Sequence, residues 1–194
     1  MIVESNPTPR CPSLDFRFAR EPWERRQYYA LRRAIFCEEQ GIFSDTDRDD
    51  RDSDALPIVA VHDQILMSGD VVGVVRIDEP SPGVWWGSRL GVDPSYRSMT
   101  DFTPRGVFEH QEVPTRFSSV GATLIYKAVS TAQAFGCHTF RAHVQRKNVP
   151  LFRWLHWRSV EELTLHGEPH HRMEADLSHY PASTMSHDPE PQFA

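Results

Sequence analysis

The sequence predicts a single domain of the α/β (α+β) class, built around a mixed sheet. Strand-like segments, bounded by Gly, Pro, Asp and Ser, occur both before and after one central apolar helix. The length of 194 residues suits one domain of about 160 residues with short tails. We expect this domain at 13–180, with a flexible tail at 1–12, an inserted loop at 98–115 and a disordered tail at 181–194.

The first elements are a strand and a helix. Leu14, Phe16 and Phe18 alternate with polar residues, which predicts a half-buried strand. Pro22 suits the first turn of the following helix, because the N–H that proline lacks would have no helical partner there. Apolar residues then recur at steps of three and four, and Gly41 fits the position just past the helix end.

The next segment, 44–54, contains six aspartates. Its opening resembles a calcium-binding loop, but Asp50 stands where that loop needs glycine and Leu56 where it needs glutamate. Two interpretations remain open. The segment is either a solvated acidic loop or a mobile loop that attracts a cationic amine.

The rest of the pattern is a series of strands around one helix. Apolar residues gather on one side of the segment from Leu124 to Phe135, which predicts that helix. A further, short helix is expected around 148–155, after the helix near the N-terminus and this central one. The expected strands are 57–61, 70–77, 85–92, 139–144, 160–165 and 172–177, with a turn at 166–171.

A phosphate-binding site is expected where the central helix begins. The loop that starts at Arg116 and ends at Ala122 is rich in Ser and Gly. The first N–H groups of a helix have no intrahelical partner, and they lie at the positive end of its dipole. This end therefore suits a phosphate or pyrophosphate, and Arg97 and Arg116 add positive charge.

These residues resemble the acyl-CoA site of the GNAT superfamily of N-acyltransferases. The run VDPSYR, which ends at Arg97, is similar to the strand signature of that family. Arg116, Ser119 and Gly121 match its phosphate loop, with Ser119 in place of the first glycine, and residues 98–115 separate the two motifs. The resemblance implies a mostly antiparallel central sheet flanked by helices, with acetyl-CoA as the acyl donor and no metal.

The resemblance also implies which residues hold the donor. A third motif, NVPLFRWLHW, is similar to the family's last one, with Phe152 in place of tyrosine and His156 in place of glycine. Backbone N–H groups at 90–92 would polarise the thioester carbonyl, and those at 119–122 would hold the pyrophosphate. The implied cofactor-binding residues are Leu90, Gly91, Val92, Arg97, Arg116, Ser119, Val120, Gly121, Ala122, Asn148 and Phe152.

Other side chains are candidates for the two proton-transfer steps, which are deprotonation of the amine and protonation of the departing thiolate. Glu38 and Glu39 end the first helix, a segment that lines the acceptor side in the family, so each is a candidate base or a solvated carboxylate. Phe152 cannot protonate the departing thiolate, which makes His156 a candidate acid. Further candidates for these steps are Asp78, Tyr126 and His143.

The leading prediction is an N-acetyltransferase that moves acetyl from acetyl-CoA to the primary amine of a small molecule. Its motifs resemble a bacterial GNAT subset linked with nitrogen-starvation or nitrilase-type gene clusters. One alternative is an enzyme like the acyl-homoserine-lactone synthases, because the acidic segment and Ser88-Arg89 resemble theirs. Another is a non-catalytic acyl-CoA-binding domain, because Phe152 replaces the usual acid and 85–92 contains no carboxylate.

Bulk properties argue against several other classes. A net charge of -6 does not suit nucleic-acid binding, and no apolar run approaches the roughly 18 residues of a membrane span. The N-terminus lacks the form of a secretory signal, and three scattered cysteines predict a reducing cytoplasm. His166, His170 and His171 match no closed zinc site. The sequence leaves open whether the chain forms a homodimer.

Overall fold

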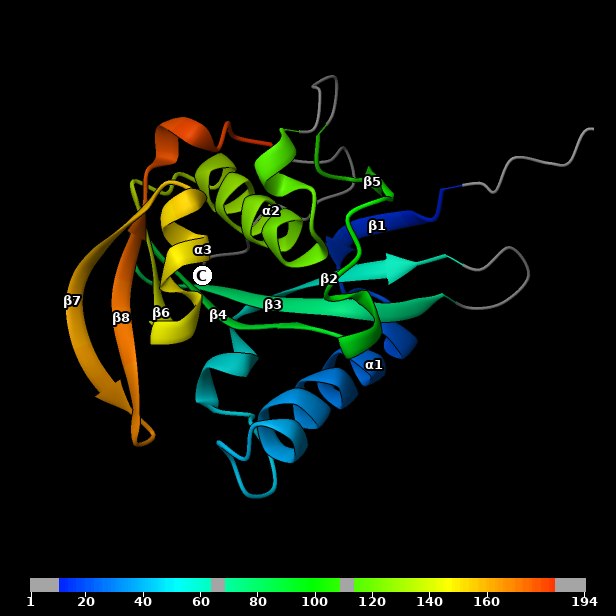
Figure 1. The fold of residues 1–194 in the computed structure, drawn as a ribbon, viewed down its shortest axis with the longest axis horizontal. Coiled ribbons are helices and arrows are strands. Elements are labelled where there is room, and N and C mark those ends of the chain that lie inside the picture. The colour runs from blue at the N-terminus through cyan, green and yellow to red at the C-terminus, as the bar shows by residue number, and fades with distance from the viewer. Residues whose placement is uncertain (1–10, 64–68, 109–113, 184–194) are drawn as a thin grey trace, which may run out of the picture.

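The computed structural model of the protein is built on one eight-stranded sheet (Figure 1). It describes residues 11–63, 69–108 and 114–183. The strands are β1 (Ser13–Phe18), β2 (Leu56–His62), β3 (Asp70–Ser81), β4 (Val84–Val92), β5 (Thr103–Arg105), β6 (Thr139–Gln145), β7 (Trp157–Leu165) and β8 (Glu168–Ala175). The α-helices are α1 (Pro22–Arg33), α2 (Val120–Ala134) and α3 (Val149–Trp154).

The strands lie in the order β5-β1-β2-β3-β4-β6-β8-β7. Neighbouring strands run antiparallel, except that β4 is parallel to β6 and β1 is parallel to β5. Parallel neighbours need a crossover connection, and α2 provides it between β4 and β6. The predicted fold class, a single mixed α/β domain with a mostly antiparallel sheet flanked by helices, is confirmed.

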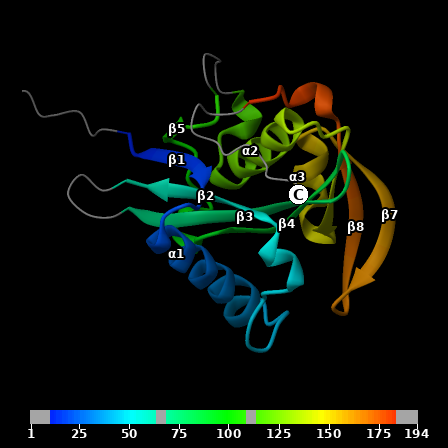
Figure 2. The ribbon, with the colours of Figure 1, turned by 180° about the vertical axis from the view of Figure 1, so that it is seen from behind.

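Helices cover the two faces of the sheet unequally (Figures 1 and 2). On one face, α2 is buried along nearly its whole length and packs with α3 over the main core. On the other face, α1 packs mainly on β3, with Tyr28 against Val59 and Val74. Strands β6, β8 and β7 extend beyond α1 on that face. None of the described helices is long and apolar enough to cross a membrane.

The sequence patterns explain which strands are central. β1 alternates buried and half-buried residues, because only one of its faces lies on the main core. β3 instead carries eight consecutive buried residues, since α2 covers one face and α1 the other. Arg76 and Asp78 belong to this buried run, so both require polar partners.

The last hairpin differs from the prediction. Its turn consists of His166 and Gly167 alone, and 168–171 belong to β8, where a turn was expected. His166 has φ 52° and Gly167 has φ 80°, the left-handed pair that a two-residue type I′ turn requires. The expected strand at 172–177 was therefore placed about four residues too late. The several polar residues and Pro169 gave a misleading turn signal.

The inserted loop 98–115 contains structure that the sequence did not predict. Within it, β5 pairs in parallel with β1 and extends the sheet at one edge. Val107 is buried, and Phe102 and Phe108 pack against the main core. Residues 109–113 lie outside the described residues, as do most of the two predicted tails (1–10 and 184–194). The tail boundaries therefore stay predictions.

Candidate functional site

β4 and β6 separate part of the way along, and a cavity opens between them. The two strands pair from Val84 with Thr139 to Gly87 with Ala142. β4 then continues to Val92 and β6 to Gln145 with no further pairing between them. The cavity at this point has a volume of about 440 Å³, which is the size of a small-molecule site. Backbone groups on the inner edges of both strands are available to a ligand there.

Residues from both faces of the sheet line this cavity. The α2 face supplies apolar groups, including Ile125, Ala128 and Phe152. The α1 face supplies mostly polar groups, among them Arg51 and Asp78. The cavity thus joins an apolar compartment to a polar one through the opening in the sheet.

A β-bulge in β4 shapes the wall of the cavity. The register with β3 shifts between Val74 and Arg76, so that Arg89 and Leu90 both lie opposite one residue. Arg89 has φ 54°, a left-handed conformation that costs an L-residue about 1–2 kcal/mol. Bulges re-aim side chains near active sites. Here Leu90 lines the cavity, and the Arg89 side chain reaches the acidic segment.

The end of the first helix closes the cavity on the α1 face. α1 continues as a π-helical segment, Ala34–Glu39, in which the Gln40 N–H donates to the Ile35 carbonyl at 3.0 Å. Such turns occur often at functional sites. Phe36 and Gln40 line the cavity, and Gln40 Oε1 accepts a hydrogen bond from Gln145 Nε2 at 3.1 Å. This bond bridges the helix end to β6.

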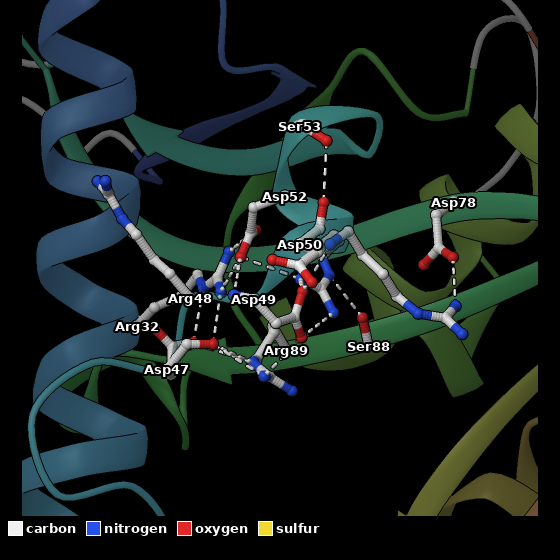
Figure 3. A network of polar contacts seen from close by, with 12 residues as sticks. Arg32, Asp47, Arg48, Asp49, Asp50, Asp52, Ser53, Asp78, Ser88 and Arg89 are labelled. Carbon is white, nitrogen blue, oxygen red and sulfur yellow. Dashed lines mark hydrogen bonds and ion pairs between the residues drawn. The ribbon is translucent and has the colours of Figure 1, made fainter.

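The acidic segment is folded onto the sheet by arginines, beginning with Arg32 (Figure 3). Arg32 has no exposed side-chain surface, and its Nε donates to Asp47 at 2.7 Å. Its Nη2 donates to Asp52 at 3.1 Å. Burial opposes ionisation of Asp52, but hydrogen bonds from Arg32 and from the Asp49 N–H lower the pKa of Asp52 to about 2. Asp52 is therefore charged at neutral pH.

Two further arginines complete this network (Figure 3). Arg76 donates to both oxygens of Asp49, at 2.6 and 3.0 Å, and Arg89 Nε donates to Asp47 at 3.0 Å. Asp47 is only 2% exposed. The other residues of the segment are exposed, apart from the partly buried Asp52, so the interpretation as a solvated loop holds for all of the segment except Asp47 and Asp52. The second interpretation was a mobile loop that attracts a cationic amine. Asp47, Asp49 and Asp52 are not free for that role, because each already binds an arginine.

Asp78 and His143 line the cavity on its polar side. Asp78 is 8% exposed and accepts one hydrogen bond from Arg51 Nη1 at 2.6 Å. Burial raises the pKa of Asp78 above its usual range, although Arg51 opposes this effect. Burial lowers the pKa of His143, and electrostatic interactions with His170 and Arg172 lower it further. Asp78 is thus a stronger base than an ordinary aspartate, and His143 is neutral at pH 7.

The N-terminus of α2 lies beside the end of β4. Ser119 is the N-cap, and its Oγ accepts a hydrogen bond from the Ala122 N–H at 3.3 Å. The N–H groups of Val120 and Gly121 remain in the unpaired first turn. A Cβ at Gly121 would meet only Val92 Cγ2, at 3.6 Å. Gly121 therefore leaves room beside this helix end.

Three of the predicted donor-binding residues line the cavity, namely Leu90, Asn148 and Phe152. The predicted catalytic pair does not. Glu38 pairs with Arg33, and Glu39 binds Arg97 Nη1 at 2.8 Å while Arg97 Nε donates to the Val92 carbonyl. The hydrogen bond from Arg97 lowers the pKa of Glu39. Glu39 is accordingly a weaker base than a free glutamate.

His156 also lies apart from the cavity, near the loop before α2. Its Nε2 contacts Arg116 Nη1, and its ring stacks on His179 with centroids 3.5 Å apart. Arg116 also donates to the Trp154 carbonyl at 3.3 Å. Burial and the charges of His179 and Arg116 lower the pKa of His156. A neutral imidazole beside a guanidinium suits anion binding better than proton donation.

Sequence reasoning missed the arginines of the network. One signal was present, since Arg76 interrupts a continuous apolar strand and a buried charge needs a partner. The pairing itself was not predictable, because the sequence offers several aspartates at similar distances along the chain. In the described ranges, no group of three His, Cys, Asp or Glu side chains is arranged to hold a metal ion.

The fold is similar to solved structures of N-acetyltransferases, some of them of the GNAT family. A putative N-acetyltransferase from Lactobacillus plantarum has a TM-score of 0.66 at 21% identity, covering 85% of this chain and 99% of that one. ElaA from Escherichia coli has a TM-score of 0.63 at 17% identity, covering 84% and 99%. A chimeric spermidine N-acetyltransferase from Vibrio cholerae and hSSAT has a TM-score of 0.55 at 17% identity, covering 87% and 98%.

These similarities establish the shared fold, because each identity is below 25%. No protein-family profile matches the sequence. No curated protein matches it either. The activity must therefore be argued from the site.

Proposed function

We propose that the protein is an N-acyltransferase that transfers acetyl from acetyl-CoA to a primary amine of a small molecule. The observation that carries this proposal is the cavity where β4 and β6 separate, beside the N-terminus of α2. It offers an apolar side for the donor and a polar side for the acceptor. The shared fold with N-acetyltransferases, one of them named for spermidine, supports the same reaction class.

The donor would bind along β4 and the start of α2. The N–H groups of Val120 and Gly121 would hold the pyrophosphate, with Arg116 nearby for charge. The pantetheine arm would follow the unpaired edge of β4 between Leu90 and Phe152, which both line the cavity. Backbone N–H groups at 90–92 would stabilise negative charge on the thioester oxygen.

The acceptor would enter from the α1 face. Its amine nitrogen attacks the thioester carbonyl carbon, the C–N bond forms, and the C–S bond breaks to release the CoA thiolate. Asp78 would take the proton from the nitrogen, because it lines the cavity and its pKa is raised. The thiolate, with a solution pKa near 8.5, can leave without a dedicated acid and is then protonated by solvent. Glu38, Glu39 and His156 suit these steps less well, since they lie outside the cavity lining.

The first experiment is a calorimetric titration with acetyl-CoA, with CoA alone as the comparison. Micromolar binding followed by thiol release with a pool of primary amines is the expected result. Binding without release for any amine would indicate a non-catalytic acyl-CoA-binding domain. An absence of binding would overturn the proposal.

A second candidate function is that of an acyl-homoserine-lactone-synthase-like enzyme. The residues behind that resemblance lie together at the cavity. Ser88 Oγ accepts a hydrogen bond from Arg76 Nε at 2.9 Å, and Arg89 binds the acidic segment. Product analysis with an acyl carrier protein and S-adenosylmethionine separates the two candidates, because only the second would form a lactone.

Three expectations remain predictions alongside this function. They are a cytoplasmic location, a link to nitrogen-starvation or nitrilase-type gene clusters, and the capacity to form a homodimer.

A further inference from the structure

Charges of both signs lie on the polar side of the cavity. Among the described residues, its lining includes three arginines (Arg51, Arg76 and Arg89) and two carboxylates (Asp49 and Asp78). Asp47 and Asp52 lie behind this lining and pair with Arg89 at 3.0 Å and with Arg76 at 3.1 Å. The charges therefore nearly balance, so this side suits an acceptor that carries both signs of charge better than one that is only positive.

Most of these charges are already paired with one another. Asp49 accepts from two nitrogens of Arg76 and also from Arg89 Nη2 at 3.1 Å. Arg89 additionally donates to Asp47. The side chains of Arg76 and Arg89 are only 3% and 16% exposed. These groups form a fixed wall, and removing any one of them would leave a buried charge without its partner.

Arg51 and Asp78 are different. They share one hydrogen bond, from Arg51 Nη1 to Asp78 Oδ2, and the Arg51 side chain is 54% exposed. No described contact uses Arg51 Nε, Arg51 Nη2 or Asp78 Oδ1 in the part of the chain that the structure describes. A guanidinium can bind a carboxylate through two such N–H groups. The pair thus offers one positive and one negative binding position side by side.

We infer that the acceptor is a zwitterion of the amino-acid class, with a primary amine and a carboxylate in reach of each other. Its ammonium binds Asp78 Oδ1, and its carboxylate binds the free N–H groups of Arg51. The ammonium and carboxylate of the acceptor then lie antiparallel to the Arg51–Asp78 ion pair, so that each charge is next to an opposite one. Arg51 is the specificity-determining residue. This inference rests on the proposed function.

The test compares matched acceptors by thiol release at saturating acetyl-CoA. The panel contains the standard amino acids, their methyl esters and spermidine. For the wild type, we expect the best amino acid to have a KM at least about tenfold below that of its ester, because the ester cannot form the charged hydrogen bonds that the carboxylate forms with Arg51. Arg51→Gln should raise the KM for that amino acid at least about tenfold, with little change for the ester.

Arg33→Gln is the matched control. Its side chain is also 54% exposed and ion-paired, but it binds Glu38 and Asp45 and does not line the cavity. Its KM values should equal those of the wild type. Preference of the wild type for esters or spermidine, equal effects of the two substitutions, or no turnover of any amino acid despite acetyl-CoA binding would overturn the inference. Failure to bind acetyl-CoA would instead overturn the proposed function on which it rests.

Discussion

The two faces of the sheet meet at the cavity but are held together by different forces. On the α2 face, the main core is built from apolar side chains, with Leu124, Val129 and Phe140 at 0–1% exposure. On the α1 face beyond the helix, the acidic segment is attached through Arg32 and its neighbours. The stability of the α2 face depends on the amount of apolar area removed from water. The attachment of the acidic segment on the α1 face depends on individual charge pairs.

This difference teaches where the protein tolerates change. Apolar packing is not directional, and cores accept many substitutions of similar volume. A buried ion network is different, because the loss of one partner leaves the other charge desolvated and unpaired. We therefore expect the polar wall of the cavity to be the more sensitive region, both for stability and for turnover.

The largest effect on stability is expected at Arg32. Arg32→Met fills a similar volume but leaves Asp47 and Asp52 without their shared cation, which should lower the free energy of unfolding by about 3–5 kcal/mol. Urea unfolding measures this change. Arg33→Met, at the neighbouring exposed position, should cost less than about 1 kcal/mol. Similar losses for the two variants would show that the network is not what fixes the acidic segment.

The next effect is expected on turnover at Asp78. Asp78→Asn removes the proposed base and should lower kcat at least about a hundredfold, with little change in acetyl-CoA affinity. Because its pKa is raised, the wild-type rate should fall with acidity at a higher pH than for an ordinary aspartate. Glu39→Gln is the comparison, and it should change kcat less than about threefold. A large loss of kcat for Glu39→Gln, without one for Asp78→Asn, would show that Glu39 at the end of the first helix is the base.

A smaller effect is expected on the apolar side, at the start of α2. Gly121→Glu should weaken acetyl-CoA binding at least about tenfold, since a carboxylate at this helix end repels the pyrophosphate. The fold should survive, because the added side chain meets only Val92 at its base. Calorimetry gives the affinity, and thermal unfolding checks the fold. Gly121→Ala should bind within about twofold of the wild type, and unchanged affinity in both variants would place the pyrophosphate elsewhere.

Much of the fold was predictable because local patterns repeat over many residues. The alternation of Leu14, Phe16 and Phe18 predicted β1, and the apolar side of the segment after Leu124 predicted α2. The helix end at Gly41 was also anticipated, and this residue has φ 62°. The β7–β8 hairpin was misplaced because Pro169 and the polar residues beside it are equally typical of a loop.

The site was only partly predictable. Leu90, Asn148 and Phe152, which the motifs implied for donor binding, line the cavity, and their binding role stays a prediction. Glu39 and Arg97 were assigned to different roles, yet they bind each other. Both residues are long, charged and flexible, and nothing local to either one specifies a partner 58 residues away.

The sequence by itself determined the order of most strands and helices, the mixed sheet and the helix start at which phosphate binding is predicted. These features follow from periodicity and from backbone groups, which depend on neighbours along the chain. Only the tertiary structure decided which aspartate binds which arginine, that Asp78 and Arg51 face the cavity, and that Glu39 does not. Charge pairing is decided by distance in space and by burial, and both arise only when strands far apart in sequence are brought side by side.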